Sequence, residues 1–271
     1  MINSAKSNSL IATISIISFI IGFALSNLVK DYQIVLFPGS YIPEFIFLII
    51  ILSLFLSLQT IYSLVYLSRS DALIGNVIFS ASFVSGIFSL QFKSLNLYSI
   101  ILSVLMILLG LISFQRKFVE ISSNQIKKEY NHTIKISAKL LIILIATIST
   151  LNFYNINQKI PLNKILTPES IDKIIDPSIE VITTAMKIPA EYVAISDVKA
   201  VVETQITTYI KPYESYLPLI FALGFYFMIA FILSISRFFA GITIKYLISE
   251  LIKYGVIKEE IIAIDTKRIS F

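Results

Sequence analysis

The sequence predicts an all-α integral membrane protein, a polytopic bundle of six transmembrane helices with a small extracytoplasmic cap of amphipathic helices. Composition is the first reason: 56% of the 271 residues are hydrophobic and 14% are charged, and the mean hydropathy is +0.84. An ordinary soluble domain has about a quarter of its residues charged. The second reason is distribution, because the apolar residues form long runs without Asp, Glu, Lys, Arg or His.

Each of these runs has about 20 residues, which is the length that a helix needs to cross a hydrocarbon slab of about 30 Å. A helix also satisfies its own backbone hydrogen bonds in lipid. The membrane domain, 1–158, holds five predicted spans at 10–29, 45–67, 73–92, 95–114 and 140–158, and the sixth span is 217–236. The first run also has a small-residue pattern typical of a cleaved signal peptide. We favour a span, because the run is longer than the usual apolar region of a signal peptide, about 7–15 residues.

The segment 159–216, between the fifth and sixth spans, is too polar to span a membrane and too regular to be disordered. We expect an extracytoplasmic helical cap there. Its strongest helix begins near Asp197 and ends at Lys211-Pro212, and its apolar residues recur at helical spacing. This face needs cover from the membrane surface, from neighbouring helices or from another protein. The candidate partner contacts are Val198, Val201, Val202, Ile206, Tyr209 and Ile210.

Helical periodicity continues after the sixth span, so 237–271 is predicted to be a cytoplasmic amphipathic helix and tail, with Gly255 as its stop. Most of the 22 Lys and Arg residues fall on the side of the membrane that holds both termini. Cytoplasmic loops carry an excess of such residues. The sequence therefore predicts cytoplasmic N- and C-termini.

The polar residues inside the spans are small or neutral. Small residues four apart let helices approach closely in lipid, and the helix-packing candidates are Ser18, Gly22, Ser26, Gly75, Ser82 and Gly86. A smaller set could line a polar path, since pores also use neutral polar side chains. That set is Gln59, Thr60, Ser63 and Asn76, with Ser82 beside it.

The sequence offers no catalytic, cofactor-binding or metal-binding residues. It has no cysteine and one histidine, His132, which excludes disulfides, thiolate metal sites and a histidine-rich catalytic metal centre. No phosphate-binding glycine loop or dinucleotide fingerprint occurs. The net charge is +5, but the basic residues are not interleaved with aromatic residues as they are on a nucleic-acid-binding surface. We recognise no family from its motifs.

These features predict a non-enzymatic membrane protein, a scaffold or accessory subunit of a membrane assembly, without a cofactor. Its expected partners are the lipid bilayer and either another membrane protein or a second copy of itself. The alternative is a channel or permease for a neutral or weakly polar solute, because no ionisable side chain other than tyrosine lies within the spans.

Overall fold

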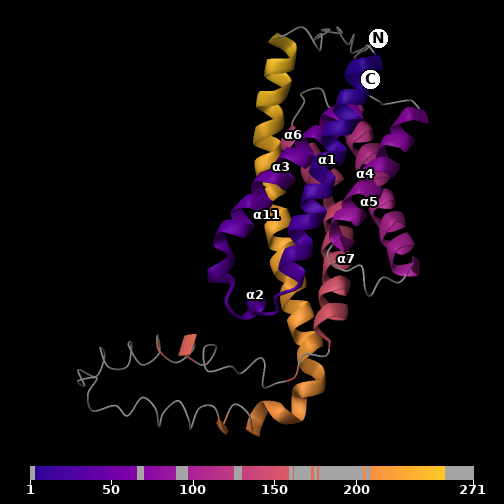
Figure 1. The fold of residues 1–271 in the computed structure, drawn as a ribbon. Coiled ribbons are helices and arrows are strands. Elements are labelled where there is room, and N and C mark those ends of the chain that lie inside the picture. The colour runs from indigo at the N-terminus through magenta and orange to yellow at the C-terminus, as the bar shows by residue number, and fades with distance from the viewer. Residues whose placement is uncertain are drawn as a thin grey trace, which may run out of the picture. The chain divides into compact units, whose positions relative to one another are not determined.

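The computed structural model describes residues 4–65, 70–89, 97–124, 130–158, 161, 172–173, 176, 204–205 and 208–253. In these ranges all regular elements are helices (Figure 1). Five stretches of the described chain are long and apolar enough to cross a membrane: Asn8–Val29, Pro38–Ser63, Tyr98–Glu120, Lys139–Asn157 and Thr208–Glu250. The prediction of a helical, multi-pass membrane protein is confirmed at this level.

The long helices are α1 (Ser4–Val29), α3 (Ile42–Val65), α4 (Ser70–Phe88), α5 (Leu97–Asn124), α7 (Lys139–Asn157) and α11 (Leu217–Lys253). Shorter elements are α2 (Gln33–Leu36), η1 (Pro38–Tyr41), α6 (Tyr130–Ser137) and η3 (Lys211–Tyr216). The chain divides into two compact units. Unit 1 is Met1–Ala24, Pro43–Ile145 and Ala230–Phe271, and unit 2 is Leu25–Ile42 and Ala146–Ile229. Helices α1, α7 and α11 therefore contribute residues to both units.

In unit 1, α4 occupies the place of the predicted third span, but its apolar part, Ala72–Phe88, is shorter than the five stretches that can cross a membrane. It stops early because Ser89 turns the chain. The backbone N of Ser89 donates to Gly86 O at 3.2 Å, and its Oγ donates to the same oxygen at 2.7 Å. The predicted third span, 73–92, thus exceeds the helix, and its last residues lie outside the described ranges. The count of six spans stays a prediction.

Helices α3 and α11 of unit 1 are joined by two serine hydroxyls. Ser53 Oγ donates to Ser236 O at 2.9 Å, and Ser57 Oγ donates to Ala240 O at 3.2 Å. Four residues further along α3 correspond to four residues further along α11, so the two helices run parallel here. In lipid such polar contacts and close packing hold helices together, because no hydrophobic force acts between them.

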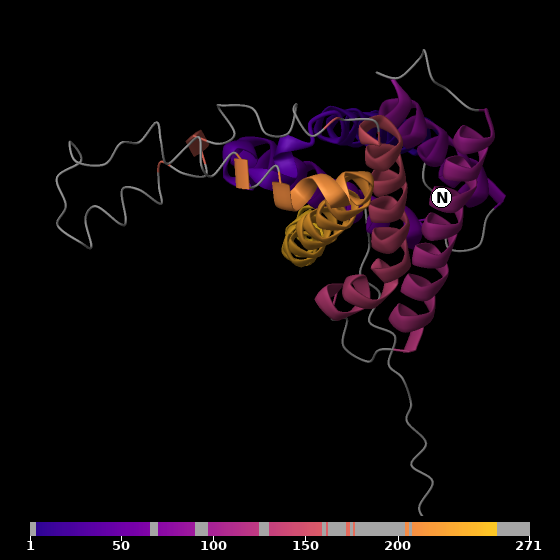
Figure 2. The ribbon, with the colours of Figure 1, turned by 90° about the horizontal axis from the view of Figure 1, so that it is seen from below.

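A break separates α6 from α7 in unit 1. Ala138 lies between them as a turn, although its N still donates to Ile134 O and its O still accepts from Ile142 N, each at 2.9 Å. Figure 2 shows α6 set at an angle to α7. Helix α6 also packs on α5.

Helix α11 is continuous over 37 residues, from Leu217 to Lys253. At 1.5 Å per residue it is about 56 Å long, well beyond a hydrocarbon slab of about 30 Å. The predicted sixth span and the start of the predicted amphipathic segment are one helix. Arg237 does not interrupt it.

Unit 2 is built around the end of α1, the loop after it, the second half of α7 and the start of α11. Phe153 and Phe225 stack at its centre with ring centroids 4.5 Å apart, and both are fully buried. In the loop, Asp31 Oδ1 accepts from Gln33 N at 2.9 Å, and Asp31 Oδ2 accepts from the Tyr41 hydroxyl. These bonds hold the turn that connects α1 to α3.

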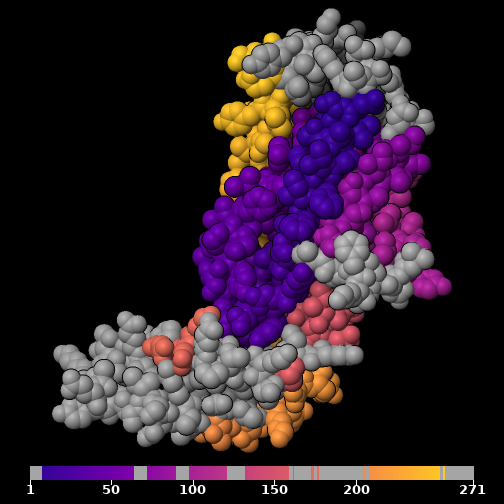
Figure 3. Space-filling view, viewed as in Figure 1, coloured from indigo at the N-terminus to yellow at the C-terminus, as the bar shows by residue number. Residues whose placement is uncertain are grey.

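The outward faces of the helices are apolar, as a lipid environment requires. Figure 3 shows α1 (indigo) and α3 (purple) side by side on one surface of unit 1. Exposed large hydrophobic residues on these two helices include Ile16, Phe19, Phe23, Ile46, Phe47 and Ile50.

Candidate functional site

Gly22 of α1 and Gly86 of α4, both predicted packing residues, face each other in unit 1. A Cβ added to Gly22 would stand 2.1 Å from Phe83 O and 3.1 Å from Gly86 Cα. A Cβ added to Gly86 would stand 2.3 Å from Phe19 O. The backbones of α1 and α4 are therefore in direct contact, so close that neither glycine position has room for a Cβ atom.

The other predicted packing residues occupy different surroundings. Gly75 lies against Tyr62, whose Oη would stand 2.0 Å from a Cβ at that position. Ser18 is buried and its Oγ donates to Ile14 O at 2.7 Å. Ser26, in unit 2, is buried with an Oγ that has no hydrogen-bond partner in the described part of the chain. Ser82 is half-exposed. The structure thus brings Gly22 and Gly86 together but leaves these four elsewhere.

The residues of the predicted polar path are buried in unit 1, on α3 and α4, and two of them meet. Gln59 Nε2 donates to Asn76 Oδ1 at 3.1 Å. Asn76 Nδ2 in turn donates to Gln115 Oε1 at 2.8 Å, which extends the contact to α5. We call Gln59, Asn76 and Gln115 the amide chain. It links three helices through side chains that carry no charge.

Thr60 and Ser63 do not join the amide chain. Thr60 Oγ1 donates to Leu56 O at 2.7 Å, and Ser63 Oγ donates to Gln59 O at 2.8 Å. Both hydroxyls thus return to the backbone one turn earlier in α3, the usual way for such groups to be satisfied in a transmembrane helix.

One acceptor of the amide chain is unsatisfied. Gln59 is fully buried, and its Oε1 has no hydrogen-bond partner among the described residues. A buried carbonyl without a donor costs about 1–3 kcal/mol. Among the described residues of α3, Gln59 thus carries a buried acceptor without a donor, within the amide chain that links α3, α4 and α5.

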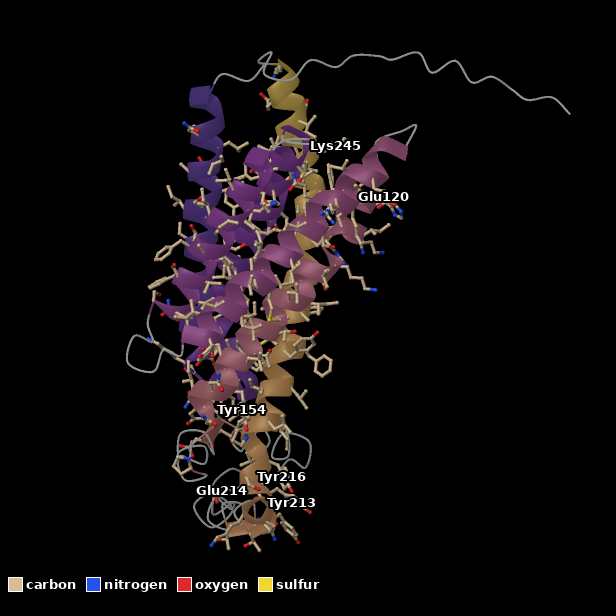
Figure 4. All side chains as sticks on the ribbon, turned by 90° about the vertical axis from the view of Figure 1, so that its right-hand side faces the viewer. Glu120, Tyr154, Tyr213, Glu214, Tyr216 and Lys245 are labelled. Carbon is tan, nitrogen blue, oxygen red and sulfur yellow. The ribbon has the colours of Figure 1, made fainter. Side chains whose placement is uncertain are left out.

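Most of the predicted partner face lies outside the described residues, including Val198, Val201, Val202 and Ile206. Of its two described members, Tyr209 is 74% exposed and Ile210 is half-buried. Further aromatic side chains follow in unit 2, where Tyr213 and Tyr216 of η3 are exposed (Figure 4). Exposed tyrosines beside an apolar helix are typical of a membrane–water boundary.

Sequence reasoning missed two polar connections. The first is Gln115, which follows directly after the last residue of the predicted fourth span; a neutral amide at the end of an apolar run was the available signal. The second is Arg237 of α11, whose Nη1 donates to Lys135 O of α6 at 3.2 Å. No pattern in the sequence relates these two positions, which are 102 residues apart.

A search for metal ligands and comparisons with known proteins assign no chemistry to this chain. Over the described ranges no three His, Asp or Glu side chains gather as metal ligands. No protein-family model, curated protein or solved structure matches the sequence.

Proposed function

We propose that the protein is a non-enzymatic scaffold or accessory subunit of a membrane assembly. The observation that carries the proposal is an exposed apolar stripe on α11 that continues beyond the length the bilayer can cover. The stripe is Phe238, Ile242 and Tyr246, spaced four residues apart on one helix face, with Phe238 63% and Tyr246 71% exposed.

Arg237 locates the bilayer boundary on α11, since an arginine within the hydrocarbon is costly. The helix from Leu217 to Arg237 is about 30 Å long, which accounts for the whole slab. The rest of α11, to Lys253, extends about 24 Å further. The stripe thus lies at the headgroups and beyond.

The opposite face of the same segment is already used within unit 1, because Ala240, Ile244 and Ile248 are buried. The stripe is the face of this segment that remains exposed. Burying apolar surface from water yields about 25 cal/mol per Å², and aromatic residues are enriched at protein interfaces. We take its partner to be a helix of another membrane protein.

Two hydrogen-bonded pairs support the finer topology of six spans. The parallel course of α3 and α11 requires an even number of reversals between them, which holds if α4, α5 and α7 each cross. In unit 2, Asn157 Nδ2 donates to Val29 O at 2.9 Å, so the C-terminal ends of α7 and α1 meet. That also agrees with the first and fifth spans running the same way, with α4 as a crossing helix.

On this topology both termini are cytoplasmic and 159–216 forms an extracytoplasmic helical cap. The chain has no cysteine, so single substitutions can report the side of each loop. We expect Ser68→Cys and Ser94→Cys to react with a membrane-impermeant maleimide from opposite sides of intact vesicles. Labelling of both from the same side would contradict the six-span proposal.

Site-specific photocrosslinking tests the proposed partner. A photoreactive residue at 242 or 246 should yield one discrete adduct with a different protein, in fixed ratio, when the tagged chain is extracted gently from its own membrane. The same residue at Phe227, an exposed position within the predicted hydrocarbon, serves as the matched control and should yield lipid adducts. Lipid adducts alone at 242 and 246 would overturn the proposal, and so would adducts only between copies of this chain.

A second candidate function, a pathway for a neutral solute, is favoured by the unsatisfied Gln59 Oε1. A solute or water molecule with a donor group would meet its demand, and the amide chain would supply further neutral polar groups. Purified protein in liposomes should then pass small neutral solutes faster than empty vesicles, and Gln59→Leu should abolish the difference. Equal flux in protein-containing and empty vesicles would exclude this candidate.

A further inference from the structure

We propose that unit 1 binds the headgroup of an anionic phospholipid on a cationic band formed by Arg116 and Lys117 of α5, Lys135 of α6, Lys139 of α7 and Arg237 of α11. The ligand class is a phosphodiester lipid with net negative charge, such as a phosphatidylglycerol.

The contacts of unit 1 bring together the helices that carry the cationic band. Helix α5 packs on α6, which carries Lys135, and a Cβ on Gly110 of α5 would stand 3.2 Å from Leu141 Cα of α7. Arg116 and Lys117 follow Gly110 on α5 by about two turns. The hydrogen bond from Arg237 Nη1 to Lys135 O, 3.2 Å, adds α11 to this group of helices.

The arginine at the centre is positioned rather than free. Lys135 belongs to the last turn of α6, just before the break at Ala138, where carbonyl groups lack helical partners. Arg237 supplies a donor to one of them. A guanidinium has five N–H donors in a planar fork that fits phosphate oxygens two at a time. One of the five is used here, so the fork is held in place with donors to spare.

Charge in this region is almost all of one sign. Across the described residues 97–124, 130–145 and 230–253, the acidic side chains are Glu120 and Glu250, and Glu250 pairs with Lys253, against the five members of the cationic band and Lys245. Figure 4 shows Glu120 on α5 with nitrogen-tipped side chains around and below it.

Exposed apolar side chains continue directly from the band toward the bilayer. Lys139 and Ile143 are one turn apart on α7, and Leu140 lies beside them. On α5, Leu105 and Leu109 are one turn apart, and Leu109 precedes Arg116 by about two turns. All four of these apolar residues are exposed. The cationic band can bind the phosphate of a phospholipid, and the apolar surface next to it can contact the acyl chains. Basic pockets between helices at the headgroup level bind such lipids.

Native mass spectrometry of the full chain tests the proposal. The protein would be equilibrated in micelles with equal amounts of phosphatidylglycerol and phosphatidylcholine and then stripped by stepwise activation. The wild type should retain phosphatidylglycerol at least tenfold over phosphatidylcholine. Tenfold corresponds to about 1.4 kcal/mol, which is well within what five basic side chains near a headgroup can contribute. Equal retention of the two lipids by the wild type would overturn the proposal.

The main variant combines Lys135→Gln, Lys139→Gln and Arg237→Gln, and it should lose the preference. Its charge-matched control combines Lys30→Gln, Lys211→Gln and Lys253→Gln, three exposed lysines elsewhere, and should keep it. Equal loss in both would mean that net charge alone attracts the lipid, which contradicts a site. Should the triple variant unfold, the double variant Lys135→Gln with Lys139→Gln leaves the Arg237 contact intact and should still lower the preference several-fold.

Discussion

Asn157 holds the end of α1 to the end of α7. Its Nδ2 donates to Val29 O, the last residue of α1, and to Phe153 O one turn back in α7, each at 2.9 Å. A helix end leaves carbonyl groups without partners, and within a buried site such a group must find a donor. One side-chain amide thus serves two helices.

We predict that Asn157→Ala destabilises the protein by about 1–3 kcal/mol, since two hydrogen bonds to buried carbonyls are lost at about 0.5–1.5 kcal/mol each. The free energy of unfolding in mixed detergent micelles would be the measurement. Asn155→Ala is the control, because Asn155 is exposed on the same helix and should change stability little. Equal effects of the two substitutions would contradict the role of Asn157.

The glycine contact between α1 and α4 predicts that Gly86→Ala is destabilising despite the better helix propensity of alanine. The added Cβ would stand 2.3 Å from Phe19 O, a backbone atom, so the helices must separate. Overpacking of this kind costs about 1–3 kcal/mol. Gly39→Ala, which meets nothing within 4 Å, supplies the comparison in thermal melts. A variant at position 86 as stable as the wild type would show that the contact is looser than described.

The amide chain predicts non-additive effects at Asn76 and Gln115. Asn76→Ala removes both links of the chain and should cost about 1–2 kcal/mol, at the rate of about 1 kcal/mol per interhelical hydrogen bond in membranes. Gln115→Ala added to it should then cost less than Gln115→Ala does in the wild type. Ser234→Ala is a suitable control, because that exposed hydroxyl bonds only within its own helix turn, at 2.8 Å to Ala230 O. Strictly additive costs in the double-mutant cycle would exclude direct coupling.

The apolar face predicted for the cap gives a fourth test, which rests on sequence because Val202 and Ile206 lie outside the described residues. Val202→Asp combined with Ile206→Asp should release a partner or disorder the cap without preventing membrane insertion. Complex size and protease resistance would be compared with Thr204→Asp, a change at an exposed polar position two residues from both Val202 and Ile206, and so on the other side of the predicted helix. If the double variant keeps the size and resistance of the wild type, the face has no contact role.

The helices could be predicted because lipid imposes a simple rule: an apolar run must satisfy its own backbone hydrogen bonds. The ends of the helices were harder to predict from the sequence. Helix α4 ends at Phe88 through the hydroxyl and amide of Ser89, a local bond that hydropathy does not register. Helix α11 passes Arg237 without a break, because a charged residue ends a hydrophobic run but leaves helical geometry unchanged.

The pairing of side chains was beyond prediction for a different reason. Small residues at Gly22 and Gly86 indicated that two close approaches exist, but the periodicity of one helix says nothing about which other helix it meets. Asn76 and Gln115 are 39 residues apart and belong to helices of similar amino-acid composition. Only the three-dimensional arrangement relates them.

The distance from Leu217 to Arg237 also makes α11 a gauge of membrane thickness. With about 30 Å between its entry and its first charge, the helix matches an average bilayer closely, and α7 is of similar length. A thinner membrane would force α11 to tilt, and a thicker one would draw Arg237 toward the lipid chains, each at a fraction of a kcal/mol per Å. Hydrophobic mismatch would thereby favour membranes of average thickness for this protein, whether or not a partner is bound.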